Sequence, residues 1–397
     1  MTKSLFKKIL RRSYGLRLSS LLTVLALLAP GTSIAKNAMC SSLFTDSRYS
    51  QVLVIDGLWR KVPGDLFMGF RSNAPHYWNW LRSNKSPLLE VTGIVSGDPH
   101  IMNFGDVPLK KGGRDFALID VDDAGVLAPL AGDFLRFFVS NQVSDFKVDS
   151  RQLFDAYLDG LNGKAMTKPS YLVAIEGKSD AQFREKQEKY LNKVSQDGKF
   201  TEKADLSPIE SAPKEVRELF QRSTQVIENA MHDFTILDRG YKVKESGGSA
   251  GLPRFWFLLE KNGEKHVWEF KLESSPAIAL YATQPQPLDR FNQVVSIYRP
   301  QEVVEGPYKF IQNGQDVFLV RERLSTYFDL EPGKTTDKKD LQDAHEMSLY
   351  IANQMGRWHG TQPNADKLLQ RLEPSSSYEH FMSLSNDYIH LMKQENK

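Results

Sequence analysis

The chain has 397 residues, 41% of them hydrophobic and 25% charged, which is typical of a globular protein with two lobes or one large core. The formal charge of +2 is uneven: residues 1–35 contain six basic and no acidic residues, and the remainder has 45 basic against 49 acidic residues, a net charge of −4. Such a balance does not indicate nucleic-acid binding.

Residues 1–35 have the three-part layout of a secretory signal peptide. A basic segment precedes an apolar run at 18–29, and the small-residue site Ser33-Ile34-Ala35 follows. The run is too short for a comfortable membrane span, so we expect cleavage after Ala35 and a periplasmic or secreted protein. The alternative is a membrane anchor formed by an uncleaved signal. The only cysteine, Cys40, excludes an intramolecular disulfide and is interpreted as a spectator thiol.

Residues 41–90 are expected to be mainly helical, and a polar motif, Gly97-Asp98-Pro99-His100-Ile101-Met102-Asn103, follows. The five-residue spacing of Asp98 and Asn103 matches a kinase catalytic loop, on which a base and a metal ligand sit together. Asp98 would orient or deprotonate an accepting hydroxyl, and Asn103 would hold magnesium. His100 is either a metal ligand or a brace for the loop, and bracing is favoured because magnesium prefers oxygen ligands.

A second polar group follows the apolar run at 116–119. This run predicts a buried strand that delivers Asp120 to the position where kinases place the second metal ligand. Asp122, two residues later, is a second-choice metal ligand. Asp133 opens a helical pattern at 134–138, where its carboxylate would cap backbone amides or brace the catalytic loop.

Each interpretation has a structural alternative. Asp and Asn favour turns, so several of these residues could be turn formers without any chemistry. This alternative applies to Asp98, Asn103, Asp122 and Asp123.

Residues 151–238 are expected to be helical and charged, with a solvated stretch at 177–205 that includes a loop. A glycine-rich loop at 246–251 then leads into a predicted hairpin with its turn at Asn262-Gly263. Kinases cover nucleotide phosphates with such a loop and add a strand lysine. The candidate phosphate-binding residues are Gly248, Ser249, Gly251 and Lys271. The alternatives are an ordinary turn and a solvated strand lysine.

Two further elements are predicted towards the C-terminus. A second hairpin at 307–311 and 316–320 turns at Asn313-Gly314, and an amphipathic helix covers 341–359.

These motifs resemble those of a bacterial family catalogued as domain of unknown function 2252. The family's Gly-Asp-x-His-x-x-Asn-Phe-Gly motif corresponds to residues 97–105, its Asp-rich turn to 120–123, its Gly-Ser-x-Gly loop to 248–251 and its Lys-Glu strand to Lys271 with Glu273. The resemblance extends over most of the chain after the signal. Residues 118–134 also resemble the corresponding segment of aminoglycoside and choline-type phosphotransferases, although Ser96 stands where these kinases usually have a histidine.

The resemblance implies an α+β, two-lobed, protein-kinase-like fold with a circularly permuted order, because the catalytic loop precedes the glycine loop. We expect residues 41–240 and 331–397 to form the helical lobe and residues 241–330 to form a β-rich nucleotide-binding lobe. The helix at 341–359 should then pack beside the loop at 97–105, since small-molecule kinases run such a helix into the catalytic loop.

The function implied is magnesium-dependent phosphoryl transfer from a nucleotide such as ATP to an unknown acceptor. The expected partners are a nucleotide or phosphorylated small molecule, with no nucleic acid and no stable membrane span after signal cleavage. Two alternatives remain open. One is a pseudokinase that binds a ligand or partner without turnover, and the other is a metal-dependent hydrolase built on Asp98, His100, Asp120 and Asp122.

Overall fold

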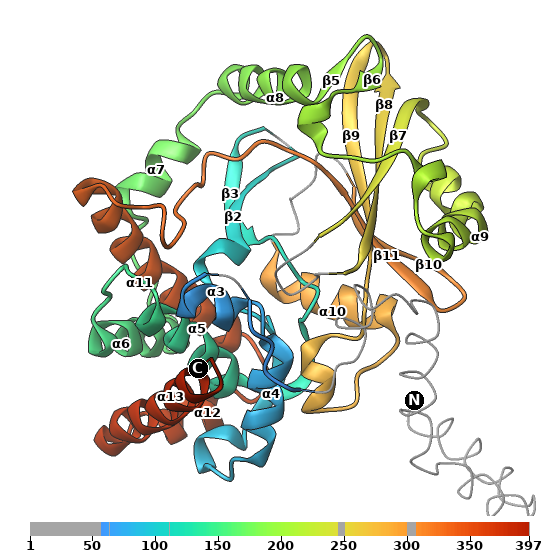
Figure 1. The fold of residues 1–397 in the computed structure, drawn as a ribbon. Coiled ribbons are helices and arrows are strands. Elements are labelled where there is room, and N and C mark those ends of the chain that lie inside the picture. Colours follow the sequence, from blue (N-terminus) through green and yellow to red (C-terminus); the bar gives the residue numbers. More distant parts are fainter. Residues whose placement is uncertain (1–56, 63, 111, 245–250, 300–306, 397) are drawn as a thin grey trace, which may run out of the picture.

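The protein combines an antiparallel sheet with a larger helical region, and the expected α+β class is confirmed (Figure 1). The computed structural model describes residues 57–396, apart from residues 63, 111, 245–250 and 300–306. The signal segment, Cys40, Gly248 and Ser249 lie outside the described residues.

Five strands form the sheet, in the order β10-β11-β9-β8-β7, and every neighbouring pair is antiparallel. Their bounds are β7 (Thr235–Val243), β8 (Pro253–Lys261), β9 (Glu264–Leu272), β10 (Tyr308–Asn313) and β11 (Asp316–Glu322). Both predicted hairpins are confirmed. The β8–β9 turn has positive φ at Asn262 (54°) and Gly263 (81°), as a tight two-residue turn requires. The β10–β11 turn consists of Gly314 and Gln315, one residue later than expected, because Asn313 still pairs with Asp316.

Helices cover both faces of the sheet, which explains why β8 is apolar at nearly every position. Phe255 and Phe257 pack with Phe220 of α9 (Lys214–Ala230), while Trp256 and Leu258 pack on the other face with Leu191 of α8 (Asp180–Val194). A strand that is buried on both faces needs apolar side chains in both directions.

The helix α8 lies within the range 151–238 that the sequence predicts to be helical, and it occupies part of the solvated stretch at 177–205. Ser179 and Gln182 form a reciprocal capping box that starts it. Only Phe183, Leu191 and Val194 are buried along its 15 residues, so its sequence is too polar to reveal the apolar stripe. A short hairpin, β5 (Ser195–Gln196) with β6 (Lys199–Phe200), follows it.

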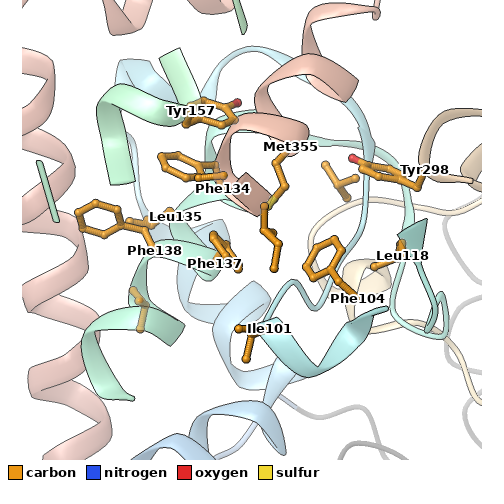
Figure 2. Close-up of a cluster of buried hydrophobic side chains, with 14 of the residues drawn as sticks. Ile101, Phe104, Leu118, Phe134, Leu135, Phe137, Phe138, Tyr157, Tyr298 and Met355 are labelled. Carbon is orange, nitrogen blue, oxygen red and sulfur yellow. The ribbon is translucent and has the colours of Figure 1, made fainter. Parts of the chain in front are cut away.

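The helical region surrounds α5 (Leu130–Val143), which is almost entirely buried (Figure 2). Its other helices are α3 (Leu66–Arg71), α4 (Ala74–Ser83), α6 (Ser150–Leu161), α7 (Ser170–Glu176), α10 (Pro287–Tyr298), α11 (Lys338–Gly360), α12 (Ala365–Leu372) and α13 (Ser375–Glu395). Two strand pairs carry the polar loops: β1 (Thr92–Val95) with β4 (Gly125–Pro129), and β2 (Phe104–Pro108) with β3 (Arg114–Leu118). None of the helices in the described ranges is long and apolar enough to cross a membrane.

The predicted helix at 341–359 is confirmed as α11, which begins three residues earlier behind the N-cap Asp337. It lies unusually close to α6. A Cβ on Gly160 would come within 2.0 Å of the Asn353 carbonyl oxygen, and one on Gly356 within 2.2 Å of the Tyr157 carbonyl oxygen. Glycine at both crossing points therefore lets the two backbones touch.

The predicted proximity of this helix to the loop at 97–105 is also confirmed. Trp358 stacks on Phe104 with an interplanar angle of 10°. Beyond the helix, the Gln362 side chain bonds both the amide and the carbonyl of Ile94 in β1. The segment that ends α11 thus lies beside the strand that leads into the loop.

A pH-dependent link joins β9 to β11. His266 Nδ1 lies 2.7 Å from Glu322 Oε1, and this hydrogen bond raises the pKa of His266 against the opposing effect of burial. The raised pKa means that the pair stabilises the fold below pH ~6.5 and that this contribution is lost as the pH rises through the folded-state pKa. We expect Glu322→Gln to lower the free energy of unfolding by about 0.5–1 kcal/mol at pH 5.5 and by much less at pH 9. Urea unfolding at both pH values measures this, with the exposed Glu218→Gln as control, and an equal loss at both would contradict it.

Candidate functional site

A small cavity of about 90 Å³ lies where the sheet meets the polar loops. It brings together five residues predicted as site residues, which are Asp98, His100, Asn103, Asp120 and Asp122. The other lining residues are Arg71, Asp123, Lys244, Leu252, Arg254, Glu273, Ser274 and Arg321. Leu252 is the sole apolar side chain in this set, so the cavity suits a charged group and not a hydrocarbon.

The loop at 96–103 connects β1 to β2 and is shaped by Gly97. This residue has φ +81°, and a Cβ there would approach the Asp123 carbonyl oxygen to 1.9 Å. The indole nitrogen of Trp78 donates to the Gly97 carbonyl at 2.6 Å. Glycine therefore allows this loop to touch the Asp-rich turn that forms the next part of the site.

Asp133 of α5 holds the loop through its side chain. Its fully buried carboxylate accepts hydrogen bonds from the Ser96 amide, the Ser96 hydroxyl and the Gly97 amide, each at 2.9 Å. His359 of α11 lies 3.4 Å from the same carboxylate, and its two ring nitrogens are also within hydrogen-bond distance of Tyr157 and Tyr298. Of the two predicted roles for Asp133, bracing describes these contacts, because Asp133 lies one turn inside α5.

Asp98 is bound to a buried arginine. Arg136 of α5 donates to Asp98 Oδ1 from Nε at 2.8 Å and from Nη2 at 2.5 Å, while His100 Nε2 lies 3.5 Å from Oδ2. Burial opposes ionisation of Asp98, but Arg136 and His100 outweigh it and lower the pKa to about 2. Asp98 is therefore ionised at neutral pH and a weak base.

Asn103 and His100 have different positions around Asp98. Asn103 Nδ2 donates to the Asp98 carbonyl at 2.8 Å, which leaves its Oδ1 as the atom for a metal or ligand. His100 is fully buried, and burial lowers its pKa despite the neighbouring Asp98. Its contact with Asp98 agrees with the bracing interpretation and does not by itself exclude metal ligation.

The Asp-rich turn between β3 and β4 is held from the opposite side. Asp123 Oδ1 accepts a hydrogen bond from the Ala277 amide at 2.7 Å, and burial beside Asp98 raises the pKa of Asp123 to about 7. Arg290 of α10 donates to the backbone carbonyls of Asp122 and Ala124. The turn is thus fixed through its backbone, which leaves Asp120 and Asp122 to face the cavity.

Lys271 of β9 lies buried among carboxylates. It pairs with Asp122, and its Nζ is 3.4 Å from Glu273 Oε1 and 4.0 Å from Asp120 Oδ1. Lys271 and the surrounding cations lower the pKa of Asp120, although burial opposes this. A fully buried lysine in these contacts is not a solvated strand residue.

The glycine-rich loop connects β7 to β8, and both of its flanks reach the cavity. Gly251, with φ +83°, donates its amide to the Lys244 carbonyl at 2.8 Å. Lys244 and Arg254 flank the loop and line the cavity, and burial near Arg254 and Arg71 lowers the pKa of Lys244 to about 8. Phosphate is well suited to such cations beside a backbone loop.

Several functional candidates were missed by the sequence reasoning: Arg71, Arg136, Lys244, Arg254, Arg290 and Arg321. Arg136 could have been predicted from the sequence, because an arginine inside the apolar pattern 134–138 is buried and needs a buried partner. For Arg290 and Arg321 the partners are distant in sequence. Arg321 Nε donates to Glu269 at 2.8 Å, and Arg321, Arg323 and Arg254 together hold the pKa of Glu269 low despite its burial.

The side chains at the cavity have the oxygen chemistry of a magnesium site. Asp120 Oδ1, Asp122 Oδ1 and Glu273 Oε1 are buried without a hydrogen-bond partner in the described part of the chain. Two of these oxygens lie within ion-pair distance of Lys271, and carboxylate oxygens are the ligands that magnesium prefers. Within the same residues, no group of three or more His, Cys, Asp or Glu side chains is placed so that it could hold a metal ion. Asn103 and phosphate oxygens would have to complete the coordination.

Residues 60–149 match a family model described as "Uncharacterized protein conserved in bacteria (DUF2252)". This supports a relation to a bacterial domain of unknown function. The matched segment contains α3 to α5 and both polar loops, and the later motifs at 248–251 and 271–273 lie outside it. Comparison with curated proteins finds no similar sequence, and comparison with solved structures finds no similar structure.

The contacts of Asp133 predict the effect of removing its charge. In Asp133→Asn one carboxylate oxygen becomes an NH2 group, which faces an N–H donor of Ser96 or Gly97 in either orientation. We expect a loss of about 2–3 kcal/mol in the free energy of unfolding, measured by urea denaturation. Ser96→Ala, which removes a single hydroxyl donor, should cost about 1 kcal/mol. An Asp133→Asn loss no larger than that of Ser96→Ala would contradict the role of Asp133 as a brace.

Proposed function

We propose that the protein is a two-lobed, circularly permuted, kinase-like phosphotransferase that uses magnesium and a nucleotide such as ATP. The observation that carries the proposal is the shared cavity of Asp98, Asn103 and Asp120, next to the buried Lys271. These residue types are the ones that phosphoryl transfer needs: a residue that orients the acceptor, two metal ligands and a phosphate-neutralising cation.

The order of the sheet supports the proposal. Counted from β7, the glycine-rich loop connects the first and second strands, and Lys271 lies on the third. In protein kinases the glycine loop covers the phosphates and the lysine lies on the third strand. One departure is that the carboxylates around Lys271 come from Glu273, just after the end of β9, and from the Asp-rich turn, while the following helix α10 contributes Arg290.

The contact between α11 and the loop at 97–105 supports a permuted order. Trp358 near the end of α11 stacks on Phe104, and Gln362 bonds to β1, although more than 250 residues separate them in sequence. Joining α11 to β1 in space would restore a helix that runs into the catalytic loop. Such rearrangements are tolerated where segments at the two ends of a chain lie close together.

The contacts support a role for each residue in this proposal. Asp98 Oδ2 would accept a hydrogen bond from the acceptor hydroxyl, and with a pKa of about 2 it orients this group more than it removes the proton. Asn103 Oδ1 and Asp120 would hold magnesium, with Asp122 as a further ligand. When bound, magnesium would offset charge on the transferred phosphoryl group. Lys271 would offset charge on the phosphates, with Gly248, Ser249 and Gly251 as the other phosphate-binding residues.

The strong hold of Arg136 on Asp98 favours a second candidate, a pseudokinase that binds a nucleotide or partner without turnover. A carboxylate committed to a buried guanidinium is a poor proton acceptor. Steady-state turnover of MgATP with a panel of hydroxyl acceptors separates the two candidates.

We further propose that the protein acts outside the cytoplasm, on the basis of the basic, apolar and small-residue order of residues 1–35. N-terminal sequencing of the protein from a periplasmic fraction should give Lys36 as the first residue. Recovery of the chain in the cytoplasm with Met1 intact would overturn this and would remove the difficulty of supplying ATP to an exported kinase.

Asp120→Asn tests the metal site. We expect the unmodified protein to gain thermal stability only with ATP and magnesium together, and Asp120→Asn to weaken this binding about 10-fold or more. The reason is that a neutral amide replaces a direct, negatively charged oxygen ligand poorly. A thermal-shift titration measures it, with the exposed Asp159→Asn as a matched control that should bind normally.

An equal response of Asp120→Asn and the unmodified protein would contradict the proposed metal ligand. A shift with magnesium alone would instead support a hydrolase. Asp98→Asn is a less clean test, because it would also leave the buried Arg136 without its carboxylate partner.

A further inference from the structure

Two of the four cations that line the cavity have no carboxylate within ion-pair distance in the described residues. Arg254 and Arg321 pair with Glu269. Arg71 and Lys244 make no such pair. Arg71 bonds only weakly, from Nη1 to the Met102 sulfur at 3.3 Å. Among the described residues, the cavity therefore has two cations without an ion-pair partner.

These two cations belong to different sides of the site. Lys244 directly follows β7 and leads into the glycine-rich loop, which would lie on the side of the donor phosphates. Arg71 ends α3, on the helical side (Figure 1).

Rigid contacts tie Arg71 to the catalytic loop. The Phe70 carbonyl, one residue before Arg71, accepts a hydrogen bond from Arg136, the same arginine that holds Asp98. Phe67 packs edge-on against His100, with ring centroids 6.0 Å apart. The position of Arg71 is thus set relative to Asp98, where the acceptor hydroxyl would lie.

We propose that the acceptor is an anionic hydroxy compound, with a phosphate or carboxylate group that Arg71 binds beside the hydroxyl. The inference rests on the proposed phosphotransferase function. A guanidinium binds both anions through paired hydrogen bonds. In the transfer, the acceptor oxygen bonds to the γ-phosphorus as that phosphorus separates from the leaving nucleoside diphosphate oxygen. The hydroxyl proton passes to water, while Asp98 keeps the hydroxyl in line.

Paired acceptors test this. The pairs are glycerol with glycerol 3-phosphate, glucose with glucose 6-phosphate, and glycerol with glycerate, each measured by consumption of ATP in the presence of magnesium. We expect the anionic member of at least one pair to raise turnover about 10- to 100-fold over the neutral member. The phosphate and carboxylate arms show which anion is preferred. In parallel, inorganic phosphate should raise the melting temperature of the protein saturated with MgADP.

Arg71→Met should reduce the preference for the anionic over the neutral acceptor to about 2-fold or less, and it should abolish the rise in melting temperature with phosphate. The KM for ATP should stay within about 2-fold of that of the unmodified protein. Because Arg71 has no ion pair among the described residues, the variant should fold normally. Arg71→Lys should retain part of the preference. Arg82→Met, at an exposed arginine that ends α4, is the matched control and should behave as the unmodified protein.

The outcomes separate the two proposals. If MgATP binds but neither phosphate nor any anionic acceptor has an effect that depends on Arg71, the anionic-acceptor inference is wrong and the phosphotransferase proposal survives. If MgATP neither binds nor turns over but phosphate still binds in an Arg71-dependent way, the phosphotransferase proposal fails and the acceptor inference falls with it, leaving an anion site.

Discussion

The buried carboxylate of Asp133 is the interaction on which the arrangement of the site depends. It accepts three hydrogen bonds from the turn at Ser96 and Gly97, and it lies beside His359 at the end of α11. A fully buried carboxylate is costly unless its oxygens are satisfied, and here Ser96 and Gly97 of the loop at 96–103 satisfy them. The loop cannot move away without exposing this charge to an apolar core, so the positions of Asp98 and Asn103 follow from those of α5 and α11.

The second constraint is charge balance. Carboxylates of the Asp-rich turn and of Glu273 pair with Lys271 of the sheet, and Glu269 pairs with Arg254 and Arg321 on the strands beside it. Charged side chains interact strongly in such a cavity because the local dielectric constant is low. Those that lack an oppositely charged partner are best stabilised by a ligand that supplies the opposite charge. A metal ion would meet the unpaired oxygens of Asp120 and Asp122, and anionic groups would meet Lys244 and Arg71. A ligand with both kinds of charge would therefore be bound best when its parts are present together.

Short-range chemistry accounts for what the sequence predicted well. The β8–β9 hairpin was predictable because Asn262-Gly263 favours a tight turn between two apolar runs. The segments 97–103 and 120–122 were predicted to form one site. This was possible because the spacing of Asp98 and Asn103, and the position of Asp120 after an apolar run, match a known arrangement of two loops. The residues that hold the loops of the site in place were not predictable in this way. Arg290 bonds to the Asp-rich turn from more than 160 residues away, and the tertiary fold alone creates that contact. The bounds of α8 were not predictable, because few of its side chains are buried and this leaves little periodicity to detect.

The contact of α11 with the catalytic loop bears on how this fold would be assembled. Gly160 and Gly356 allow α6 and α11 to touch, which fixes α11 against the helical region and places Trp358 on Phe104. The loop at 96–103 and the helix that supports it are far apart in sequence, and the sheet lies between them in chain order. The geometry of the loop therefore depends on the packing of α11, because His359 and Gln362 contact Asp133 and Ile94 although they follow the loop by more than 250 residues.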